Sequence, residues 1–451
     1  MILINPTTEE RLESFPDHSP REVDQLLMTA AQGYRIWWET PFAARASRFE
    51  DLARLLRLRK PDLAVLMTHE MGKTVTGGEA EIEKCAAACL LFAERAEGWL
   101  APQPIESDAV ESYVRFDPLG PVLAIMPWNF PFWQFIRFAA PALMAGNTAV
   151  LKHAPNVPGC GEAIEELFRD AGFPEGVMVN VRVPNDRAET LVQHDAIAAV
   201  TLTGSERAGK AVATAAAGVL KKSVLELGGS DPFIVLPDAD LDTVAKSAVE
   251  ARCINSGQSC IAAKRFIVVG DAQEFAAKMA AIMLGMTVGN PAERKTQLGP
   301  LARLDLLENL HGQVERSLAA GATLITGGQR ISRKGFFYEP TVLANVQPGM
   351  AAFDEETFGP VAAVIEAADI DDAIRLANLS RYGLGASLWT TDPFAAEQLA
   401  PRLECGNVFI NGAVKSDPHL PFGGIKNSGW GRELSALGLH EFTNIKTVWI
   451  K

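Results

Sequence analysis

The segment AIAAVTLTGSERAGKAVATAAAGVLKKSVLELGG (196–229) contains a strand, a helix and a second strand in succession. The apolar run AIAAVTLT (196–203) predicts a buried strand, and ERAGKAVATAAAGVLKK (206–222) predicts a helix. SVLELGG (223–229) predicts the second strand, closed by two glycines that mark a turn. A strand–helix–strand order is typical of a parallel βαβ unit, so this segment predicts a parallel sheet covered by helices.

The segments on either side repeat this alternation. Upstream, the predicted strands are PVLAIMP (121–127), TAVLKHA (148–154) and VMVNVRV (177–183). The helix-like runs FWQFIRFAAPALMAGN (132–147), which Pro141 is expected to interrupt, and GCGEAIEELFRDAGFP (159–174) lie between them. After residue 230, runs such as FIVL, RFIVV and PVAAVIEA alternate with helical patterns again. The sequence therefore predicts an α/β protein with two units.

Composition excludes several classes of protein. The chain has 451 residues, is 48% hydrophobic and carries a formal net charge of −13. This is an ordinary globular composition, and the negative charge argues against a nucleic-acid partner. The six cysteines form no CxxC pair and are too sparse for a disulfide scaffold. Reduced thiols in a cytoplasmic protein are therefore predicted, and no metal site is.

No membrane association is predicted. The N-terminal stretch MILINPTTEERLESF becomes polar at once and does not read as a signal peptide. The most apolar run, GPVLAIMPWNFPFWQFI (120–136), contains Pro121, Pro127 and Pro131, which would break a spanning helix. We interpret this run as buried core.

Two segments do not fit the βα pattern. Residues 101–120 are extended and bounded by prolines, and the terminal NIKTVWIK (444–451) alternates like an edge strand. Both would expose unpaired strand edges on a monomer. A homo-oligomer, either a dimer or a tetramer, is therefore predicted.

Loops at the carboxyl ends of the predicted strands are the expected binding positions, because open parallel sheets bind ligands there. These loops carry Trp128, Asn129, Lys152, Gly204 and Ser205. The backbone N–H groups at the helix start after Gly204 suit a phosphate. A glycine cap without chemical meaning is the commoner cause of this pattern, by roughly two to one.

Cys260 differs from the other cysteines in its surroundings. It ends the small polar turn NSGQSC (255–260), whereas the other five lie in helix-like or apolar runs and read as inert. A cysteine of this kind is either a buried small side chain or a nucleophile. Glu226, at a strand end beside two glycines, is either a surface charge or a general base.

Six ordered motifs carry a family resemblance. They are PWNFP (127–131), TGS (203–205), LELGGSDP (225–232), NSGQSC (255–260), EETFGPV (355–361) and PFGGIKNSGWGRE (421–433). Together they resemble the aldehyde dehydrogenase superfamily, most closely its bacterial succinate-semialdehyde dehydrogenase branch. The resemblance implies a Rossmann-type cofactor domain, an α/β catalytic domain and a small β extension for oligomerisation. The implied ranges are 1–100, 121–227 and 431–440 for the first, 228–430 for the second, and 101–120 and 441–451 for the extension.

The resemblance also implies roles for individual residues. Cys260 would attack an aldehyde, the Asn129 amide would stabilise the oxyanion, and Glu226 would activate water to hydrolyse the thioester. NAD or NADP would accept the hydride. Pro155 stands where many NAD-using members have a glutamate, so a 2′-phosphate is tolerated here. The implied cofactor-binding residues are Ile125, Trp128, Lys152, Pro155, Gly204, Ser205, Leu227, Gly228, Glu356 and Phe358.

The implied substrate is succinate semialdehyde. Arg137, in the helix that follows Asn129, would bind its carboxylate, with Ser416 as a hydroxyl partner and Arg252 as a second cation. An isolated helix arginine is more often a structural residue paired with an acid, but beside Asn129 we favour the pocket role for Arg137. Glutarate semialdehyde, a short aliphatic aldehyde and a non-catalytic protein of the same fold stay as alternatives.

Overall fold

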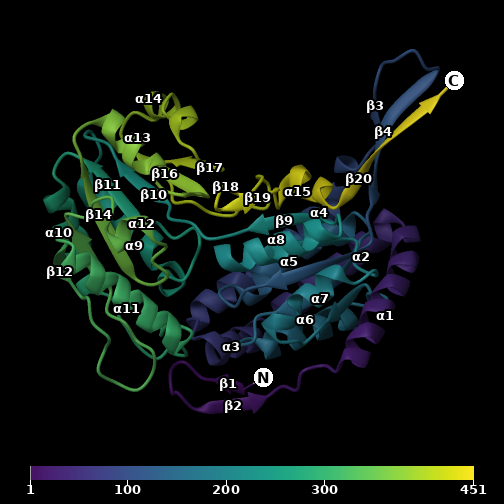
Figure 1. The fold of residues 1–451 in the computed structure, drawn as a ribbon, viewed down its shortest axis with the longest axis horizontal. Helices are drawn as coiled ribbons and strands as arrows, with labels where there is room; N and C mark the ends of the chain where they lie inside the picture. The colour runs from purple at the N-terminus through teal and green to yellow at the C-terminus, as the bar shows by residue number, and fades with distance from the viewer. Residues whose placement is uncertain (1) are drawn as a thin grey trace.

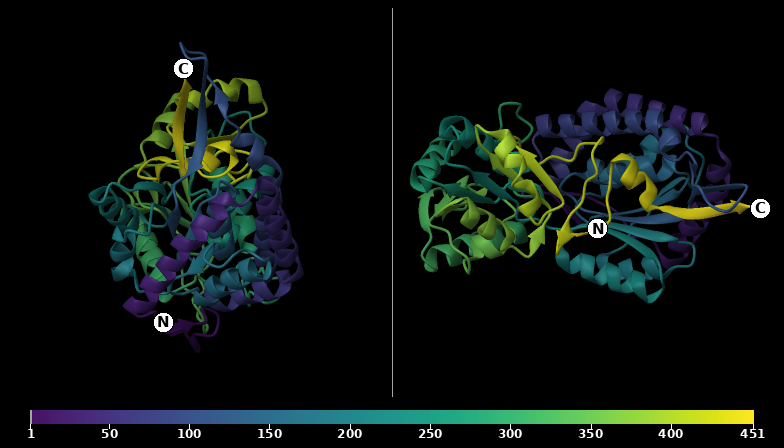
Figure 2. Two further views of the ribbon diagram at one scale, coloured as in Figure 1. Left: turned by 90° about the vertical axis from the view of Figure 1, so that its right-hand side faces the viewer. Right: turned by 90° about the horizontal axis from the view of Figure 1, so that it is seen from above.

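The computed structural model describes residues 2–451, and over this range the chain forms two α/β lobes with a β-arm projecting from one of them (Figure 1). Seen from above, the two lobes lie side by side, and β20 runs out along the arm to the C-terminus (Figure 2). The predicted α/β class is confirmed.

The first lobe is built on a sheet of order β19-β9-β8-β5-β6-β7. Its strands are parallel except for β19, which pairs antiparallel with β9. The strands are almost fully buried, as the near-continuous apolar runs predict for a sheet covered on both faces. They are β5 (Pro121–Met126), β6 (Thr148–His153), β7 (Met178–Asn180), β8 (Ala199–Thr203), β9 (Lys222–Glu226) and β19 (Gly429–Trp430).

Helices fill the connections of this sheet and cover its faces. Ser19 begins α1 with a capping box, in which its side chain accepts from the Glu22 N–H and the Glu22 carboxylate accepts from the Ser19 N–H. The helices are α1 (Pro20–Glu39), α2 (Phe42–Leu58), α3 (Lys60–Met71), α4 (Val75–Trp99), α5 (Pro131–Met144), α6 (Pro158–Asp170), α7 (Ala188–Gln193), α8 (Glu206–Gly218) and α15 (Ser435–Glu441).

The apolar run 120–136 forms β5 and the start of α5, both buried, which confirms its interpretation as core. Within residues 2–451, no helix is long and apolar enough to cross a membrane. The expected interruption at Pro141 is wrong, because α5 continues through it to Met144. Dense packing on all sides of α5 holds the helix despite the missing N–H.

The second lobe contains a sheet of order β12-β13-β14-β11-β10-β16-β17, parallel except for the edge strand β12. Its strands are β10 (Pro232–Val235), β11 (Arg265–Val269), β12 (Thr323–Thr326), β13 (Thr341–Ala344), β14 (Val361–Ala367), β16 (Gly385–Trp389) and β17 (Asn407–Ile410). Its helices are α9 (Leu241–Cys253), α10 (Ala272–Leu284), α11 (Leu304–Ala319), α12 (Ala351–Asp354), α13 (Ile370–Asn378) and α14 (Pro393–Glu397).

The projecting arm is an antiparallel sheet of order β20-β4-β3. β4 and β20 pair along their full lengths, from Thr443 opposite Pro118 to Ile450 opposite Glu111. Both segments that were expected to be extended are therefore strands of one sheet. The strands are β3 (Gln103–Pro104), β4 (Glu111–Pro118) and β20 (Thr443–Ile450). Two small two-stranded antiparallel sheets complete the fold, β1 (Ile2–Ile4) with β2 (Arg11–Ser14), and β15 (Tyr382–Gly383) with β18 (Ile425–Lys426).

The strand order of the first lobe explains where a ligand can bind. The chain runs from β5 outward to β6 and β7, then returns to the other side of β5 to form β8 and β9. The loops after β5 and β8 therefore leave the sheet in opposite directions and open a crevice between them.

Candidate active site

Two cavities meet at Cys260. One has a volume of about 260 Å³ and is lined mainly by α4, α5 and the loop after β17; we call it the α4/α5 cavity. The other, of about 370 Å³, opens at the crevice between β5 and β8; we call it the β5/β8 cavity. Cys260 and Gln134 are the residues that line both. A molecule bound to Cys260 from one cavity can therefore contact a second molecule that occupies the other cavity.

The turn before Cys260 has an unusual backbone. Asn255 and Ser256 have φ values of 53° and 56°, and Gly257 follows with 76°. Two adjacent non-glycine residues in the left-handed region are costly and persist only where the surroundings hold them. A Cβ on Gly257 would overlap the backbone of Gly359, so only glycine fits there.

Asn129 ties this turn to the loop after β5. Its side-chain Nδ2 donates to the Gln258 carbonyl oxygen over 3.1 Å, and its own carbonyl oxygen accepts from Asn255 Nδ2 over 2.8 Å. Asn129 is buried and lines the β5/β8 cavity beside Cys260. Its amide is therefore held in place next to the thiol, as an oxyanion donor requires.

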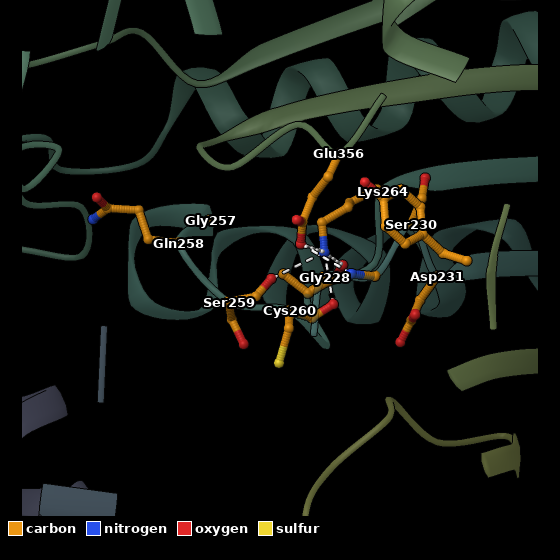
Figure 3. A network of polar contacts seen from close by, with 12 residues as sticks. Gly228, Ser230, Asp231, Gly257, Gln258, Ser259, Cys260, Lys264 and Glu356 are labelled. Carbon is orange, nitrogen blue, oxygen red and sulfur yellow. Dashed lines mark hydrogen bonds and ion pairs between the residues drawn. The ribbon is translucent and has the colours of Figure 1, made fainter. Parts of the chain in front are cut away.

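Lys264 fixes the chain on the far side of Cys260. The fully buried Lys264 ammonium donates to the carbonyl oxygens of Ser259, Cys260 and Ala262 over 3.0, 2.7 and 3.1 Å. It also lies 3.7 Å from the Glu356 carboxylate. Figure 3 shows these contacts converging on the ammonium, while the Cys260 sulfur points the other way. The backbone of Cys260 is thus held, and its side chain is free to face the cavities.

The electrostatic environment leaves Cys260 as a thiol at neutral pH. Burial raises its pKa to about 12, and the positive charges of Arg137 and Lys264 oppose this. A nucleophilic attack by Cys260 therefore has to be accompanied by loss of its proton.

The β5/β8 cavity gathers most of the expected cofactor-binding residues. The aromatic rings of Trp128 and Phe358 meet edge-to-face with centroids 5.8 Å apart. The Gly229 N–H donates to Glu356 Oε1 over 3.0 Å, and a Cβ on Gly228 would overlap the Glu356 carboxylate. The expected residues that line this cavity are Trp128, Gly204, Ser205, Leu227, Gly228, Glu356 and Phe358.

Ile125, Lys152 and Pro155 lie outside this lining. Ile125 and Lys152 are paired neighbours near the carboxyl ends of β5 and β6. Burial lowers the pKa of Lys152 to about 8, and its ammonium donates to Asn185 Oδ1 over 2.7 Å. Lys152 forms no ion pair within residues 2–451. An anionic group beyond the β5/β8 cavity would find a cation here.

The start of α8 suits a phosphate group. Ser205 is its N-cap, with Oγ accepting from the Ala208 N–H over 3.3 Å, and Gly204 precedes it at the edge of the cavity. The unpaired N–H groups and the positive end of the helix dipole face this edge. The geometry therefore fits a dinucleotide that passes from α8 into the cavity beside Cys260.

Glu226 lies at the end of β9 with its carboxyl group buried away from both cavities. Burial raises its pKa well above the usual range, and the nearby Glu433 adds to this. Arg137 forms an ion pair with Glu433. One buried cation faces two carboxyl groups, and this favours the protonated form of Glu226.

Arg137 and Ser416 both line the α4/α5 cavity, as expected for substrate-binding residues. The Arg137 guanidinium, however, pairs with Glu433, donates to Thr203 Oγ1 over 3.3 Å and stacks on Phe422. This is also the pattern of a structural arginine. Its charge is already balanced before any substrate enters.

The expectation that Arg252 is a second pocket cation is corrected. Arg252 is fully buried, lines neither cavity, and donates to the Gly257 carbonyl oxygen over 2.7 Å. It lies near the end of α9, where the guanidinium turns back to support the strained turn instead of facing the cavity.

Sequence reasoning did not single out Lys84, Trp133, Gln134, Lys264 or Glu433. The sequence gives a weak indication that Lys84 is a site residue, since it follows Glu81 by about one helical turn within the small and apolar residues of α4. Gln134 lies buried where the two cavities meet. Its Oε1 has no hydrogen-bond partner among the described residues. The partners of Lys84, Trp133 and Glu433 are remote in the chain, so no local pattern reveals them.

Comparisons with known proteins agree with this geometry. The model of the aldehyde dehydrogenase family matches residues 1–448. The chain is 49% identical over 449 residues to the succinate semialdehyde dehydrogenase [NAD(P)+] Sad of Escherichia coli (strain K12), covering 99% of this chain and 97% of the relative. It is 47% identical over 451 residues to the succinate-semialdehyde dehydrogenase [NADP(+)] 1 of Mycobacterium tuberculosis (strain ATCC 25618 / H37Rv), covering 99% of each.

A solved structure is similar over the whole chain. It is the succinic semialdehyde dehydrogenase from Streptococcus pyogenes in complex with NADP+, with a TM-score of 0.97 and 35% identity. The match covers 100% of this chain and 99% of that one.

Proposed function

Because the chain belongs to the aldehyde dehydrogenase family, we propose that it oxidises succinate semialdehyde to succinate with NAD(P)+. The observation that carries this proposal is a cavity beside Cys260 that contains both a hydroxyl and cationic groups, including Ser416, Lys84 and Arg137. A carboxylate at one end of a short aldehyde fits such a cavity. The names of full-length relatives at 47–49% identity support the same substrate.

In the proposed reaction, the aldehyde enters the α4/α5 cavity and Cys260 Sγ bonds to its carbonyl carbon. The thiol proton passes to a water molecule in the cavity, and negative charge builds on the carbonyl oxygen as the carbon–sulfur bond forms. The Asn129 side-chain amide and the Cys260 backbone N–H would donate to that oxygen. Lys264 keeps the Cys260 backbone in position through the carbonyl contacts described above.

The nicotinamide cofactor, when bound, supplies a hydride acceptor for the thiohemiacetal carbon. The residues of the β5/β8 cavity would hold it, with Glu356 accepting from ribose hydroxyls and the N-terminus of α8 donating to the pyrophosphate. Lys152 would pair with a 2′-phosphate, and Pro155 offers no carboxylate to repel one. We therefore propose that NADP is used at least as well as NAD.

Loss of the hydride leaves a thioester on Cys260, which water must hydrolyse. We propose Glu226 as the general base that takes the proton from this water. Its carboxyl group faces Arg137 and Glu433 in this structure, so its side chain has to rotate toward Cys260 for the step. The acid formed then leaves through the α4/α5 cavity.

A panel of aldehydes tests the proposed function. Succinate semialdehyde is expected to give a kcat/KM at least about tenfold above those of butanal and a cationic amino aldehyde, since an anchored carboxylate is worth on the order of 1.5 kcal/mol or more. Glutarate semialdehyde, which has the same carboxylate on a longer chain, tests the distance between the anchor and Cys260. The measurement is reduced-cofactor absorbance with NAD and NADP in parallel. A clear preference for butanal would overturn the proposed substrate.

We also propose that the β-arm mediates homo-oligomerisation in a cytoplasmic enzyme. The arm exposes large apolar side chains, among them Val110, Ile445 and Trp449, at 86%, 65% and 49% of their surface. Exposed apolar surface at a strand edge favours pairing with another copy. The six cysteines are free thiols, which suits a reducing compartment.

Removing the end of the arm is expected to dissociate the oligomer. A chain truncated after Thr443 loses β20 and leaves β4 unpaired, so sedimentation velocity should show a shift to monomer. Ile445→Lys with Trp449→Lys, which keeps the strand, should act in the same direction. A fully active monomer of the intact chain would argue against this role for the arm.

A further inference from the structure

We propose that Lys84, held by Ser416, is the cationic anchor for the carboxylate of the substrate, and that Arg137 instead balances buried carboxyl groups. This inference rests on the proposed function, because it names the residue that would recognise the charged end of succinate semialdehyde. Lys84 lies on α4 and lines the α4/α5 cavity together with Cys260.

The cations of the α4/α5 cavity differ in whether they already have a carboxylate partner. Three of the four are paired: Lys73 with Glu81, Arg137 with Glu433, and Lys415 with Asp417. Lys84 forms no ion pair with any carboxylate in residues 2–451. A carboxylate that enters the cavity therefore meets Lys84 as its unpaired positive charge.

Ser416 holds the Lys84 ammonium and leaves donors available. Ser416 Oγ accepts from Lys84 Nζ over 2.7 Å and from Trp133 Nε1 over 3.0 Å. A hydroxyl has two acceptor sites and one proton, so the Ser416 proton stays free to donate. The ammonium has three protons and donates one of them to Ser416. The pair can thus offer hydrogen bonds to both oxygens of one carboxylate.

The indole ring of Trp133 orders the lysine. Lys84 Nζ lies 4.1 Å from the centroid of this ring, within the range of a cation–π contact. Trp133 itself is buried on α5. A lysine that is already ordered loses less side-chain entropy on binding, which strengthens the anchor.

Arg137 is a poorer candidate for this role. A carboxylate that binds its guanidinium has to compete with Glu433 and would lie beside a second buried acid, Glu226. Bringing a third carboxyl group to one cation costs electrostatic energy in a buried site. Binding at Lys84 avoids this repulsion.

The pKa of Lys84 adds a second readout. Burial and Arg137 lower it to about 8, while Cys85, Glu81 and Asp417 raise it. The ammonium is charged below this pH and neutral above it. The KM for an anionic aldehyde should therefore rise as the pH passes through about 8, and the KM for a neutral aldehyde should not.

The test compares Lys84→Met with Lys84→Arg. Lys84→Met is expected to lower kcat/KM for succinate semialdehyde roughly tenfold to a hundredfold, mainly through KM, and to change butanal less than about twofold. Lys84→Arg should keep most of the activity and lose the rise of KM near pH 8. Lys246→Met, which removes an exposed charge on α9, is the matched control. Arg137→Met should lower the use of both aldehydes.

Inhibition by succinate separates this inference from the proposed function. Lys84→Met should weaken inhibition by succinate to a similar extent, and this measurement stands even if wild-type enzyme prefers another aldehyde. Unchanged inhibition by succinate would overturn the role of Lys84. So would equal losses for succinate semialdehyde and butanal, because these indicate a structural lysine.

Discussion

Cys260→Ser is expected to lower aldehyde oxidation by at least about three orders of magnitude, the scale seen when a covalent nucleophile is removed. A serine hydroxyl at this position is far less nucleophilic than a thiol that loses its proton on attack. The substitution hardly changes side-chain volume, so the turn from Asn255 to Gly257 should keep its conformation. Reduced-cofactor absorbance gives the rate, and a chromogenic ester reports any remaining acyl transfer.

Cys405→Ser is the matched control for this experiment. Cys405 Sγ donates to the Asn407 carbonyl oxygen over 3.2 Å, and a serine can make the same hydrogen bond. Cys405 lines neither cavity that contains Cys260. Near-normal activity is expected for this variant. Near-normal oxidation by Cys260→Ser would show that the nucleophile has been assigned to the wrong residue.

Glu226→Gln is expected to separate the two halves of the reaction. A burst of reduced cofactor, close to one per active site, should survive because Cys260 and Asn129 are intact. The steady-state rate should then fall by about 10²–10⁴, the usual contribution of a general base. Rapid mixing measures the burst, and mass spectrometry of the quenched enzyme should detect an acyl group on Cys260.

The raised pKa of Glu226 sets a direction for the pH dependence of this step. Burial and Glu433 keep the carboxyl group neutral over a wider range, and only the ionised form can accept a proton from water. Wild-type thioester hydrolysis should therefore speed up with rising pH, and the variant should lose this dependence. A wild-type steady-state rate in Glu226→Gln would exclude the residue as the base.

The sequence predicted the α/β class well because buried parallel strands and amphipathic helices leave strong local patterns. β8, α8 and β9 all fall within the segment 196–229. The strand predicted over 177–183 is shorter, since only Met178–Asn180 pairs with β6. Lateral pairing decides where a strand ends, and apolar periodicity does not report it. The domain boundaries implied by the resemblance stay a prediction.

The sequence by itself determined the chemical groups of the candidate site. The motifs pointed to Cys260, Asn129 and Glu226, and the structure places Cys260 where the two cavities meet and Asn129 in the lining of the β5/β8 cavity. Short motifs can be recognised from the sequence because the neighbouring backbone positions the functional side chain, as the left-handed turn does before Cys260.

Only the tertiary structure decided which charges are free. Arg137 and Lys84 are both cations in helices, and nothing local distinguishes them. Glu433 comes from the C-terminal region to neutralise Arg137, and Ser416, 332 residues from Lys84, turns that lysine toward the cavity. Electrostatic interactions act through space over a few ångströms. The charge that a cavity presents therefore depends on partners that folding brings together from distant parts of the chain.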